Sequence, residues 1–333
     1  MNILVEIPKN RIFNSFFQKK QIEKIHRLGT VYWNDTDRHY TKQEFKEKLQ
    51  GMDICISGWG TPEFDEEQLE LADDLKLIAH NAGTIRPMIG EEVYKRGIRV
   101  CSGNRIFARS VAEGVLAYAL SALRRIPEYQ TELRKGNWPG LEGTRGLYGK
   151  RVGLIGYGMI GEIVANMFQT FGCTVLVASK HMRSEELQEK EIQSSSITEV
   201  FESCDIISIH LSLTEETRES IGYELLHKMK KQAVLINTAR GEIVDEVALS
   251  FLLEKRPDLQ AVLDVFQTEP LPMDSPLRKL NNAFLMPHAA GPTEDQRLYV
   301  TDFILDDIER FQCGNPLKGE ISRWRAKTMT TKF

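Results

Sequence analysis

The sequence predicts an α/β protein made of two doubly wound parallel-sheet domains. Three observations support this fold class. The chain has 333 residues, about twice the ~150 residues of an ordinary domain. Short β-rich runs alternate with helix-sized segments in both halves, which is the pattern of parallel βαβ units. A glycine-rich turn, GLIGYGMIGE at 153–162, is present only in the second half.

The first half contains five β-rich runs and no glycine fingerprint. The expected strands are ILVEI (3–7), TVYW (30–33), DICIS (53–57), LKLIAH (75–80) and IRVC (98–101). Polar segments of helical length separate them. We therefore expect a parallel sheet over residues 1–105.

The second half repeats the pattern with more apolar runs, as expected for strands buried on both faces of a sheet. These strands are RVGLIGYG (151–158), TVLVAS (174–179), DIISIHL (205–211), AVLINTA (233–239), QAVLDVF (260–266) and AFLMP (283–287). One helix is expected over 110–125, ended by Pro127, and a last helix over 293–313. If that last helix returns to the first sheet, the first domain is discontinuous, with residues 1–105 and 291–333 flanking a second domain at 106–290.

Composition excludes several functional classes. The net charge is −4, from 43 basic and 47 acidic residues without a long basic run, so nucleic acid is a poor candidate partner. No signal peptide is expected at the N-terminus, and no apolar stretch approaches a membrane span. The five cysteines are scattered, with no CxxC pair or Cys/His cluster at metal spacing. We expect a cytoplasmic protein with reduced thiols, no metal site and no membrane partner.

The glycine-rich turn predicts a dinucleotide site. Gly156 permits the tight turn, Gly158 lets the backbone approach a pyrophosphate, and Gly161 allows close packing of helix and strand. The amides of Met159 and Ile160 would lie at the helix N-terminus, where a phosphate binds. Since the motif follows a strand and precedes a helix, it indicates a Rossmann-type domain that binds NAD(P).

The choice between the two dinucleotides depends on the end of the next strand. An acid there would bind the ribose 2′-hydroxyl and repel a 2′-phosphate, but the sequence has Ser179 followed by Lys180 and His181. These residues favour a mild preference for NADP(H). The alternative is that they are solvated loop residues and that NAD binds.

Three residues further along the chain suggest the chemistry. Arg240 can hold a carboxylate with two parallel hydrogen bonds. His288 can exchange a proton near neutral pH when a carboxylate such as Glu269 stabilises the imidazolium. Singly, they could be a surface ion pair, a satisfied histidine and a turn residue. Together, beside a dinucleotide, they suit hydride transfer to a 2-oxo acid or from a 2-hydroxy acid.

Five ordered motifs make the chain resemble the D-isomer-specific 2-hydroxyacid dehydrogenases over nearly its whole length. These motifs are the run 150–161, DIISIHLSLTEET (205–217), INTARGEIVDE (236–246), LDVFQTEPLP (263–272) and MPHAAG (286–291). The resemblance implies a Rossmann-type cofactor domain inserted in a discontinuous flavodoxin-like substrate domain, and usually a homodimer built on the cofactor domains.

The resemblance also implies roles for individual residues. Arg240 would bind the substrate carboxylate and carbonyl oxygen, His288 would be the acid/base, and Glu269 would orient and charge it. Formate dehydrogenases have glutamine at the position of Glu269, which argues against formate. The residues that would surround the nicotinamide are Ser110, His210, Thr238, Ala239 and Asp264. For His210 and Asp264 a purely structural role is the alternative.

The resemblance is weaker in the substrate domain. The loop after the fourth strand is HNAGTIRPM, in which Asn81, Ala82 and Gly83 could offer backbone amides to a small carboxylate substrate. Trp59 lies where ligands bind, at the carboxyl end of the third strand, and is expected to line the substrate pocket. Its alternative role is packing. The sequence leaves the identity of the 2-oxo acid open.

A second function is compatible with this fold. Corepressors of the C-terminal-binding-protein type share the architecture and similar Arg, Glu and His positions, and they use the dinucleotide to control protein binding. The lack of low-complexity segments favours an enzyme.

Overall fold

The structure is a computed structural model that describes residues 1–180 and 182–330. The chain forms two compact units, which we describe separately. Unit 1 comprises Met1–Phe107 and Pro292–Phe333, and unit 2 comprises Ala108–Gly291. The chain therefore leaves unit 1 after residue 107, where the sequence suggested 105, and returns after 291, where it suggested 290.

Unit 1 contains a parallel five-stranded sheet in the order β2-β1-β3-β4-β5. The strands are β1 (Asn2–Val5), β2 (Thr30–Trp33), β3 (Ile54–Ser57), β4 (Leu77–His80) and β5 (Arg99–Ser102). All neighbouring strands of this sheet pair in parallel, and in the pairing of β1 with β3 Ile3 lies beside Ile54. The strand order changes direction between β1 and β3. In doubly wound sheets this switch point, at the carboxyl ends of the strands, is where ligands bind.

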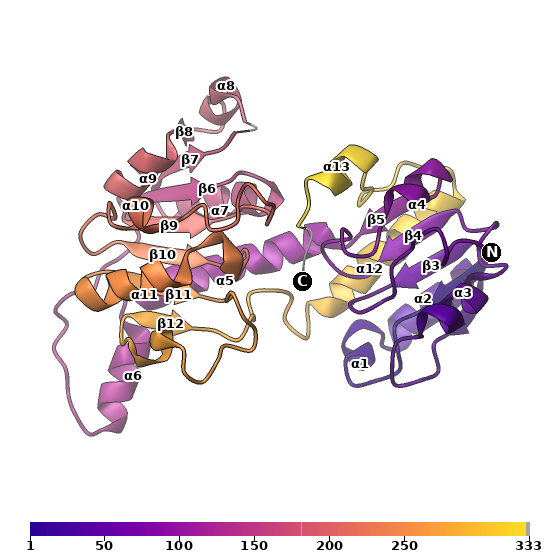
Figure 1. Cartoon of the computed structure of the whole chain (residues 1–333), viewed down its shortest axis with the longest axis horizontal. Helices are drawn as coiled ribbons and strands as arrows, with labels where there is room; N and C mark the ends of the chain where they lie inside the picture. Colours follow the sequence, from indigo (N-terminus) through magenta and orange to yellow (C-terminus); the bar gives the residue numbers. More distant parts are fainter. Residues whose placement is uncertain (181, 331–333) are drawn as a thin grey trace. The chain divides into compact units, whose positions relative to one another are not determined.

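Helices cover both faces of this sheet. Apolar side chains of α1 (Phe13–Phe16), α2 (Lys19–Leu28) and α12 (Arg297–Gln312) pack on one face. Those of α3 (Lys42–Leu49), α4 (Glu91–Lys95) and α13 (Arg323–Lys327) pack on the other. Figure 1 shows α12, near the C-terminus, beside α2, near the N-terminus. The C-terminal segment thus completes the N-terminal sheet.

Unit 2 contains a parallel seven-stranded sheet in the order β12-β11-β10-β9-β6-β7-β8. The strands are β6 (Arg151–Ile155), β7 (Thr174–Ala178), β8 (Gln193–Ser194), β9 (Ile206–Ile209), β10 (Val234–Asn237), β11 (Gln260–Leu263) and β12 (Ala283–Leu285). Counted from β6, this is the Rossmann order with one added strand. The prediction of two doubly wound parallel sheets is confirmed. Among the strands of the described residues, β8, two residues long, is the one without a counterpart among the expected strands.

The helices of unit 2 also form two layers. On one face, α5 (Asn104–Leu123) and α7 (Met159–Thr170) pack against the sheet. On the other face lie α9 (Ile197–Ser203), α10 (Tyr223–Leu226) and α11 (Glu246–Lys255). The 20-residue α5 is long and apolar enough to span a membrane by length and composition alone. Its buried side chains, however, belong to the core of unit 2, as in the central helix of a globular protein.

Two further α-helices belong to unit 2. They are α6 (Ile126–Arg134) and α8 (Ser184–Gln188). Pro127 was expected to end the helix before it, but α5 already ends at Leu123, and Pro127 lies in the first turn of α6. Proline is favoured there because a first-turn amide has no partner within the helix.

Candidate active site

The three residues expected to carry the chemistry all follow neighbouring strands of unit 2. Arg240 follows β10, Glu269 lies in the segment after β11, and His288 follows β12. The carboxyl ends of parallel strands meet at one edge of a sheet, so these loops are adjacent. The structure therefore brings together side chains that are up to 48 residues apart in the sequence (288 − 240).

Glu269 and His288 form a direct pair. Oε2 of Glu269 lies 2.8 Å from Nδ1 of His288. Oε1 of Glu269 accepts a hydrogen bond from the backbone amide of Phe266 at 3.0 Å, which fixes the carboxylate on its own loop. With Nδ1–H donated to the carboxylate, Nε2 is the ring atom available to a substrate. The side chain of His288 is 48% exposed and that of Glu269 is 37% exposed, so this pair is accessible.

Arg240 is held by the turn that carries it. The Asn237 side chain accepts the amide of Ala239 at 3.0 Å and donates to the carbonyl of Arg240 at 2.9 Å. Nη1 of Arg240 donates to the carbonyl of Ala239 at 2.6 Å, while its buried Nε has no hydrogen-bond partner within the described residues. Burial lowers the pKa of Arg240, and the charges of Glu242 and Glu269 oppose this effect. A cation with an unused donor suits an anionic ligand.

Gly241 lets the Arg240 turn approach the Glu269 loop. A Cβ at this position would lie 1.9 Å from the carbonyl carbon of Phe266, so no larger residue fits without moving the backbone. The Arg240 turn therefore packs against Phe266, whose backbone amide binds Glu269. Gly241 thereby allows Arg240 and Glu269 to lie close together.

The glycine turn after β6 has the geometry expected of a dinucleotide site. Gly156 has a φ of +90°, and a Cβ there would lie 2.6 Å from the carbonyl oxygen of His210. A Cβ on Gly161 would lie 3.0 Å from the carbonyl oxygen of Gly156, so helix and turn are in close contact. Around Gly158, the residue preceding α7, there is open space on the Cβ side. The backbone is thus exposed where a phosphate would meet the amides of Met159 and Ile160.

Two unpartnered polar groups follow β9 and β10, at the same edge of the sheet as this turn. Nε2 of His210 and Oγ1 of Thr238 are buried without a hydrogen-bond partner among the described residues. Burial lowers the pKa of His210 to about 4, so the ring is neutral at physiological pH. Buried polar groups usually have partners, so these two fit a site that a polar ligand completes. By contrast, the hydroxyl of Ser110 already donates to the carbonyl of Gly291 at 3.0 Å.

The region expected to contact the ribose contains an acid that the sequence had not suggested. Lys180 forms an ion pair with Glu216, from the loop after β9, and both side chains are more than two-thirds exposed. Ser179 also has an interaction partner. His181 lies outside the described residues. The positive charge expected to favour a 2′-phosphate is therefore partly neutralised.

In unit 1, the loop after β4 offers fewer free amides than expected. The amide of Asn81 donates to the carbonyl of Ser57 at 2.8 Å, so only its side chain is available. The amides of Ala82 and Gly83 have no acceptor among the described residues. The ring of Trp59 packs edge-on against Phe16 and Phe107, with centroids 5.5 and 5.7 Å away, and lines a small cavity. Trp59 therefore packs against its neighbours, as in the alternative considered for it, and it also borders this cavity.

Two site residues were not identified from the sequence. Tyr118, on α5, donates a hydrogen bond to Asp264 at 2.8 Å, but within its helix it resembles any core aromatic. Glu216 lies in SLTEET beside Glu215, and nothing in the local pattern pairs it with Lys180. Both contacts depend on how the strands are ordered in the sheet.

Comparison with known proteins identifies the family. Residues 116–290 match the family described as D-isomer specific 2-hydroxyacid dehydrogenase, NAD binding domain. A glyoxylate reductase of Korarchaeum cryptofilum is 32% identical over 287 residues, which are 85% of this chain and 86% of that protein.

Two solved structures cover almost the whole chain. An acyclic imino acid reductase in complex with NADPH and D-Arg is 27% identical with a TM-score of 0.80, covering 97% of this chain and 100% of that one. The D-lactate dehydrogenase of Lactobacillus jensenii with NAD+ is 25% identical with a TM-score of 0.80, over the same shares of the two chains. These comparisons do not support the corepressor alternative. The chain belongs to the D-isomer specific 2-hydroxyacid dehydrogenase family and is an NAD-dependent oxidoreductase.

Proposed function

We propose that the protein interconverts a small 2-oxo acid and its D-2-hydroxy acid, with His288 as acid/base, Glu269 as its orienting carboxylate and Arg240 as the carboxylate-binding cation. The observation that carries this proposal is the 2.8 Å contact between Nδ1 of His288 and Oε2 of Glu269, close along the sheet edge to the Arg240 turn.

The charges suit the reaction in the direction of reduction. The guanidinium of Arg240, with its unused Nε, would bind the substrate carboxylate and orient the adjacent carbonyl. Nε2 of His288 would donate a proton to the carbonyl oxygen as negative charge develops on it. Glu269 would stabilise the imidazolium before this transfer and keep the ring oriented after it.

The residues around the glycine turn fit a nicotinamide dinucleotide. The amides of Met159 and Ile160 would hold its pyrophosphate, and His210, Thr238, Ala239 and Asp264 would surround the nicotinamide. When bound, the cofactor supplies or accepts the hydride. We propose a mild preference for NADP(H), because Ser179 and Lys180 stand where an acid would repel the 2′-phosphate. The ion pair with Glu216 limits that preference.

In unit 1, the amides of Ala82 and Gly83 and the side chains of Asn81 and Trp59 are the proposed substrate-binding groups. We also propose that the protein is cytoplasmic and forms a homodimer through unit 2. Apolar side chains exposed on α6 and the segment after it support the dimer: Ile126, Leu133, Trp138, Leu141 and Tyr148.

A substrate panel with a His288 variant tests the proposal. Glyoxylate, pyruvate, 3-hydroxypyruvate and phenylpyruvate are supplied with NADH and with NADPH, and cofactor oxidation is measured. His288→Gln should reduce turnover by roughly 10²-fold or more with little change in cofactor Kd, as expected for loss of a general acid. His227→Gln, at the exposed histidine that follows α10, is the matched control. Parent-like turnover in the His288 variant would refute the assignment.

A further inference from the structure

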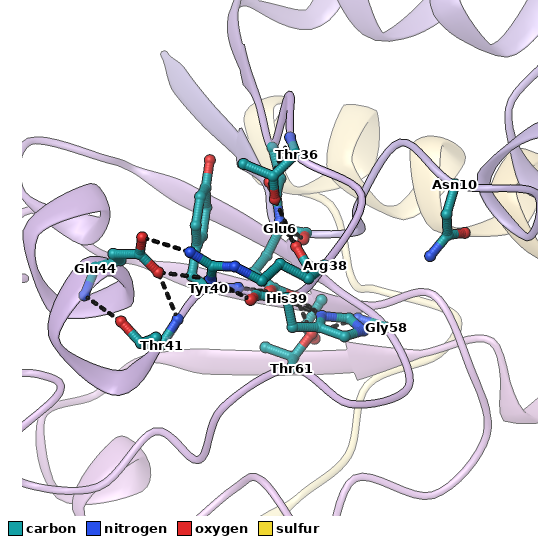
Figure 2. A network of polar contacts seen from close by, with 12 residues as sticks. Glu6, Asn10, Thr36, Arg38, His39, Tyr40, Thr41, Glu44, Gly58 and Thr61 are labelled. Atoms are coloured by element: carbon teal, nitrogen blue, oxygen red, sulfur yellow. Dashed lines mark hydrogen bonds and ion pairs between the residues drawn. The ribbon is translucent and has the colours of Figure 1, made fainter.

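A second polar network lies in unit 1, at the switch point of its sheet. Glu6 directly follows β1, and its carboxylate is completely buried. Nδ1 of His39 lies 2.9 and 2.8 Å from the two carboxylate oxygens. The hydroxyl of Thr61 donates to the carboxylate, and the amide of Tyr40 donates to it at 3.2 Å. Figure 2 shows these groups converging on Glu6.

The loop that presents His39 is fixed by several hydrogen bonds. The buried side chain of Asn34 donates to the carbonyls of Glu6 and Arg38, both at 2.9 Å. Arg38 makes two parallel hydrogen bonds to Glu44, at 2.8 and 2.9 Å, and a third to the carbonyl of His39 at 2.9 Å. Glu44 in turn belongs to the capping box of α3 (Figure 2). The position of the His39 ring is therefore fixed by Asn34, which holds the backbone before it, and by Arg38, which holds the carbonyl of His39.

The orientation of the ring is determined as well. Since Nδ1 faces the carboxylate of Glu6, Nε2 is the ring atom left without a partner in the described part of the chain. Gly60 has a φ of +86°, and a Cβ there would lie 2.8 Å from both Cδ2 and Nε2 of His39. Any side chain at position 60 would displace the ring. This arrangement leaves Nε2 as the ring nitrogen that is not bonded to Glu6, as expected of a recognition group.

His39 borders a cavity of about 40 Å³ at the carboxyl ends of β1 and β3. The apolar side chains that line it include Ile7, Pro8, Phe16 and Trp59. The polar side chains that line it are Asn10, His39 and Asn81. The Asn81 side chain donates to Thr301 at 3.0 Å, and its buried Oδ1 has no partner among the described residues. A water needs roughly 10–15 Å³ by this measure, so the cavity has room for about three non-hydrogen atoms.

We infer that this cavity binds a short substituent of the substrate that ends in a hydroxyl group, recognised by Asn81 and His39, with Glu6 as the positioning residue for His39. The inference rests on the proposed function, because Trp59 and Asn81 are among the proposed substrate-binding residues. The apolar walls suit one or two carbon atoms. Oδ1 of Asn81 requires a donor, and a hydroxyl supplies one; a hydroxyl can also bond to a ring nitrogen, as donor or as acceptor. Buried polar groups of this kind discriminate against an analogue that leaves them unpaired.

The inference predicts a specific order of substrates. 3-Hydroxypyruvate carries the hydroxymethyl group that fits the cavity, pyruvate carries only a methyl group, and the phenyl ring of phenylpyruvate exceeds the space. We expect kcat/KM for 3-hydroxypyruvate to exceed that for pyruvate by about tenfold or more. Phenylpyruvate should be the poorest of the three.

Two variants at position 39 separate recognition from folding. In His39→Asn, the shorter amide can replace Nδ1 and keep Glu6 paired, but nothing replaces Nε2. The ratio of kcat/KM for 3-hydroxypyruvate over pyruvate should fall by about threefold to tenfold. In His39→Gln, the longer amide can reach the position of Nε2 and should restore part of the ratio. Asn81→Ala removes the second recognition group without touching Glu6 and should lower the same ratio.

The outcomes distinguish this inference from the proposed function. His227→Asn is the control and should leave the ratio unchanged. Activity on several 2-oxo acids without a preference for 3-hydroxypyruvate would overturn the inference and leave the proposed function standing. An unchanged ratio in both His39→Asn and Asn81→Ala, with thermal unfolding near that of the parent, would also overturn it. If the parent reduces no 2-oxo acid of the panel, both proposals fail.

Discussion

The carboxylate of Asp264 accepts the backbone amide of Ala289, the residue after His288, at 2.8 Å. Its second oxygen accepts the amide of Ala290 at 3.0 Å, and Tyr118 donates to the first at 2.8 Å. His288 itself has a φ of +52°, a conformation rare for residues other than glycine. Asp264 therefore stabilises the turn that presents the histidine, in addition to the role near the nicotinamide that we propose for it.

Asp264→Asn should disturb this turn. The amide group of asparagine has only one acceptor atom, so one of the two backbone amides would face another donor. A displacement of about 1 Å in the catalytic group can reduce turnover by roughly 10²-fold, so we expect kcat to fall by about 10- to 100-fold. Tyr118→Phe removes one hydrogen bond but keeps both amides paired, and should have a smaller effect. Steady-state kinetics on both variants would test this, and parent-like kcat in Asp264→Asn would contradict it.

Glu269→Gln should alter the pH dependence of turnover more than its maximum. Glutamine retains an acceptor for Nδ1 of His288 but removes the charge that stabilises the imidazolium. Reduction of the 2-oxo acid requires the protonated ring. The decline of kcat/KM with rising pH should therefore begin at a lower pH in the variant. Coincident pH profiles of the two proteins, recorded from pH 5 to 9, would be inconsistent with this role.

The ribose site gives a prediction about cofactor choice. Glu216→Gln frees Lys180 from its ion pair and should tighten NADPH binding with little change for NADH. Ser179→Asp introduces the missing acid and should shift preference toward NADH. Fluorescence titrations give Kd for both dinucleotides with the parent and each variant. Tighter binding of NADH than NADPH by the parent would mean that the basic residues are only a solvated loop.

Buried histidines predict a loss of stability in acid. Burial lowers the pKa of His80 to about 3 and that of His210 to about 4, from 6.5 in the unfolded chain. Below pH 6.5 the unfolded state binds more protons, so the free energy of unfolding should decrease by about 1.4 kcal/mol per pH unit for each group. This loss continues down to the folded pKa values.

Denaturant titrations between pH 7 and 4.5 would measure it. His80→Asn keeps a side chain able to bond Ser57, which lies 3.1 Å from Nδ1, and should flatten the pH dependence. His227→Asn, at an exposed site, should not. Equal slopes in the parent and His80→Asn would refute the assignment of this loss to His80.

The proposed dimer depends on exposed apolar side chains of unit 2. Trp138 is 91% exposed and Leu141 is 76% exposed, values unusual for such large apolar groups. Light scattering of the parent should give about twice the 38.1 kDa of the chain. Trp138→Glu should shift the mass toward the monomer, whereas Met273→Glu, at another exposed apolar residue of unit 2, should not. A monomeric parent at micromolar concentration would end the proposal.

Most of the fold could be predicted because its signals are local. A strand buried on both faces, such as ICIS at Ile54–Ser57, is apolar over most of its length, and the turn at Gly156 requires a positive φ. The ends of helices were less predictable. Pro127 suits either the end of one helix or the start of the next, and only the observed end of α5 at Leu123 distinguishes them.

The site was only partly predictable, for a different reason. Arg240, Glu269 and His288 lie in ordered motifs, so their types and spacing in the chain suggested their roles. The Glu6–His39 pair joins residues 33 positions apart, and neither belongs to a motif. It exists because β1 and β2 are neighbours in the sheet, which brings together the ends of two strands. The residues next to Glu6 in the sequence do not indicate that its carboxylate is buried, and therefore do not predict that it pairs with His39.

The hydrogen bond from Ser110 to the carbonyl of Gly291 holds the two ends of unit 2 together. Ser110 lies on α5, where the chain enters unit 2, and Gly291 is the residue at which it leaves. One turn further along α5, a Cβ on Gly114 would lie 3.2 Å from the Cβ of Ala290, so the two segments remain close there. When the two ends of an inserted unit are already close together, the insertion adds little entropic cost to the folding of the domain that it interrupts. Unit 2 is therefore suited to excision, transplantation into another host protein, or circular permutation through a short joining peptide.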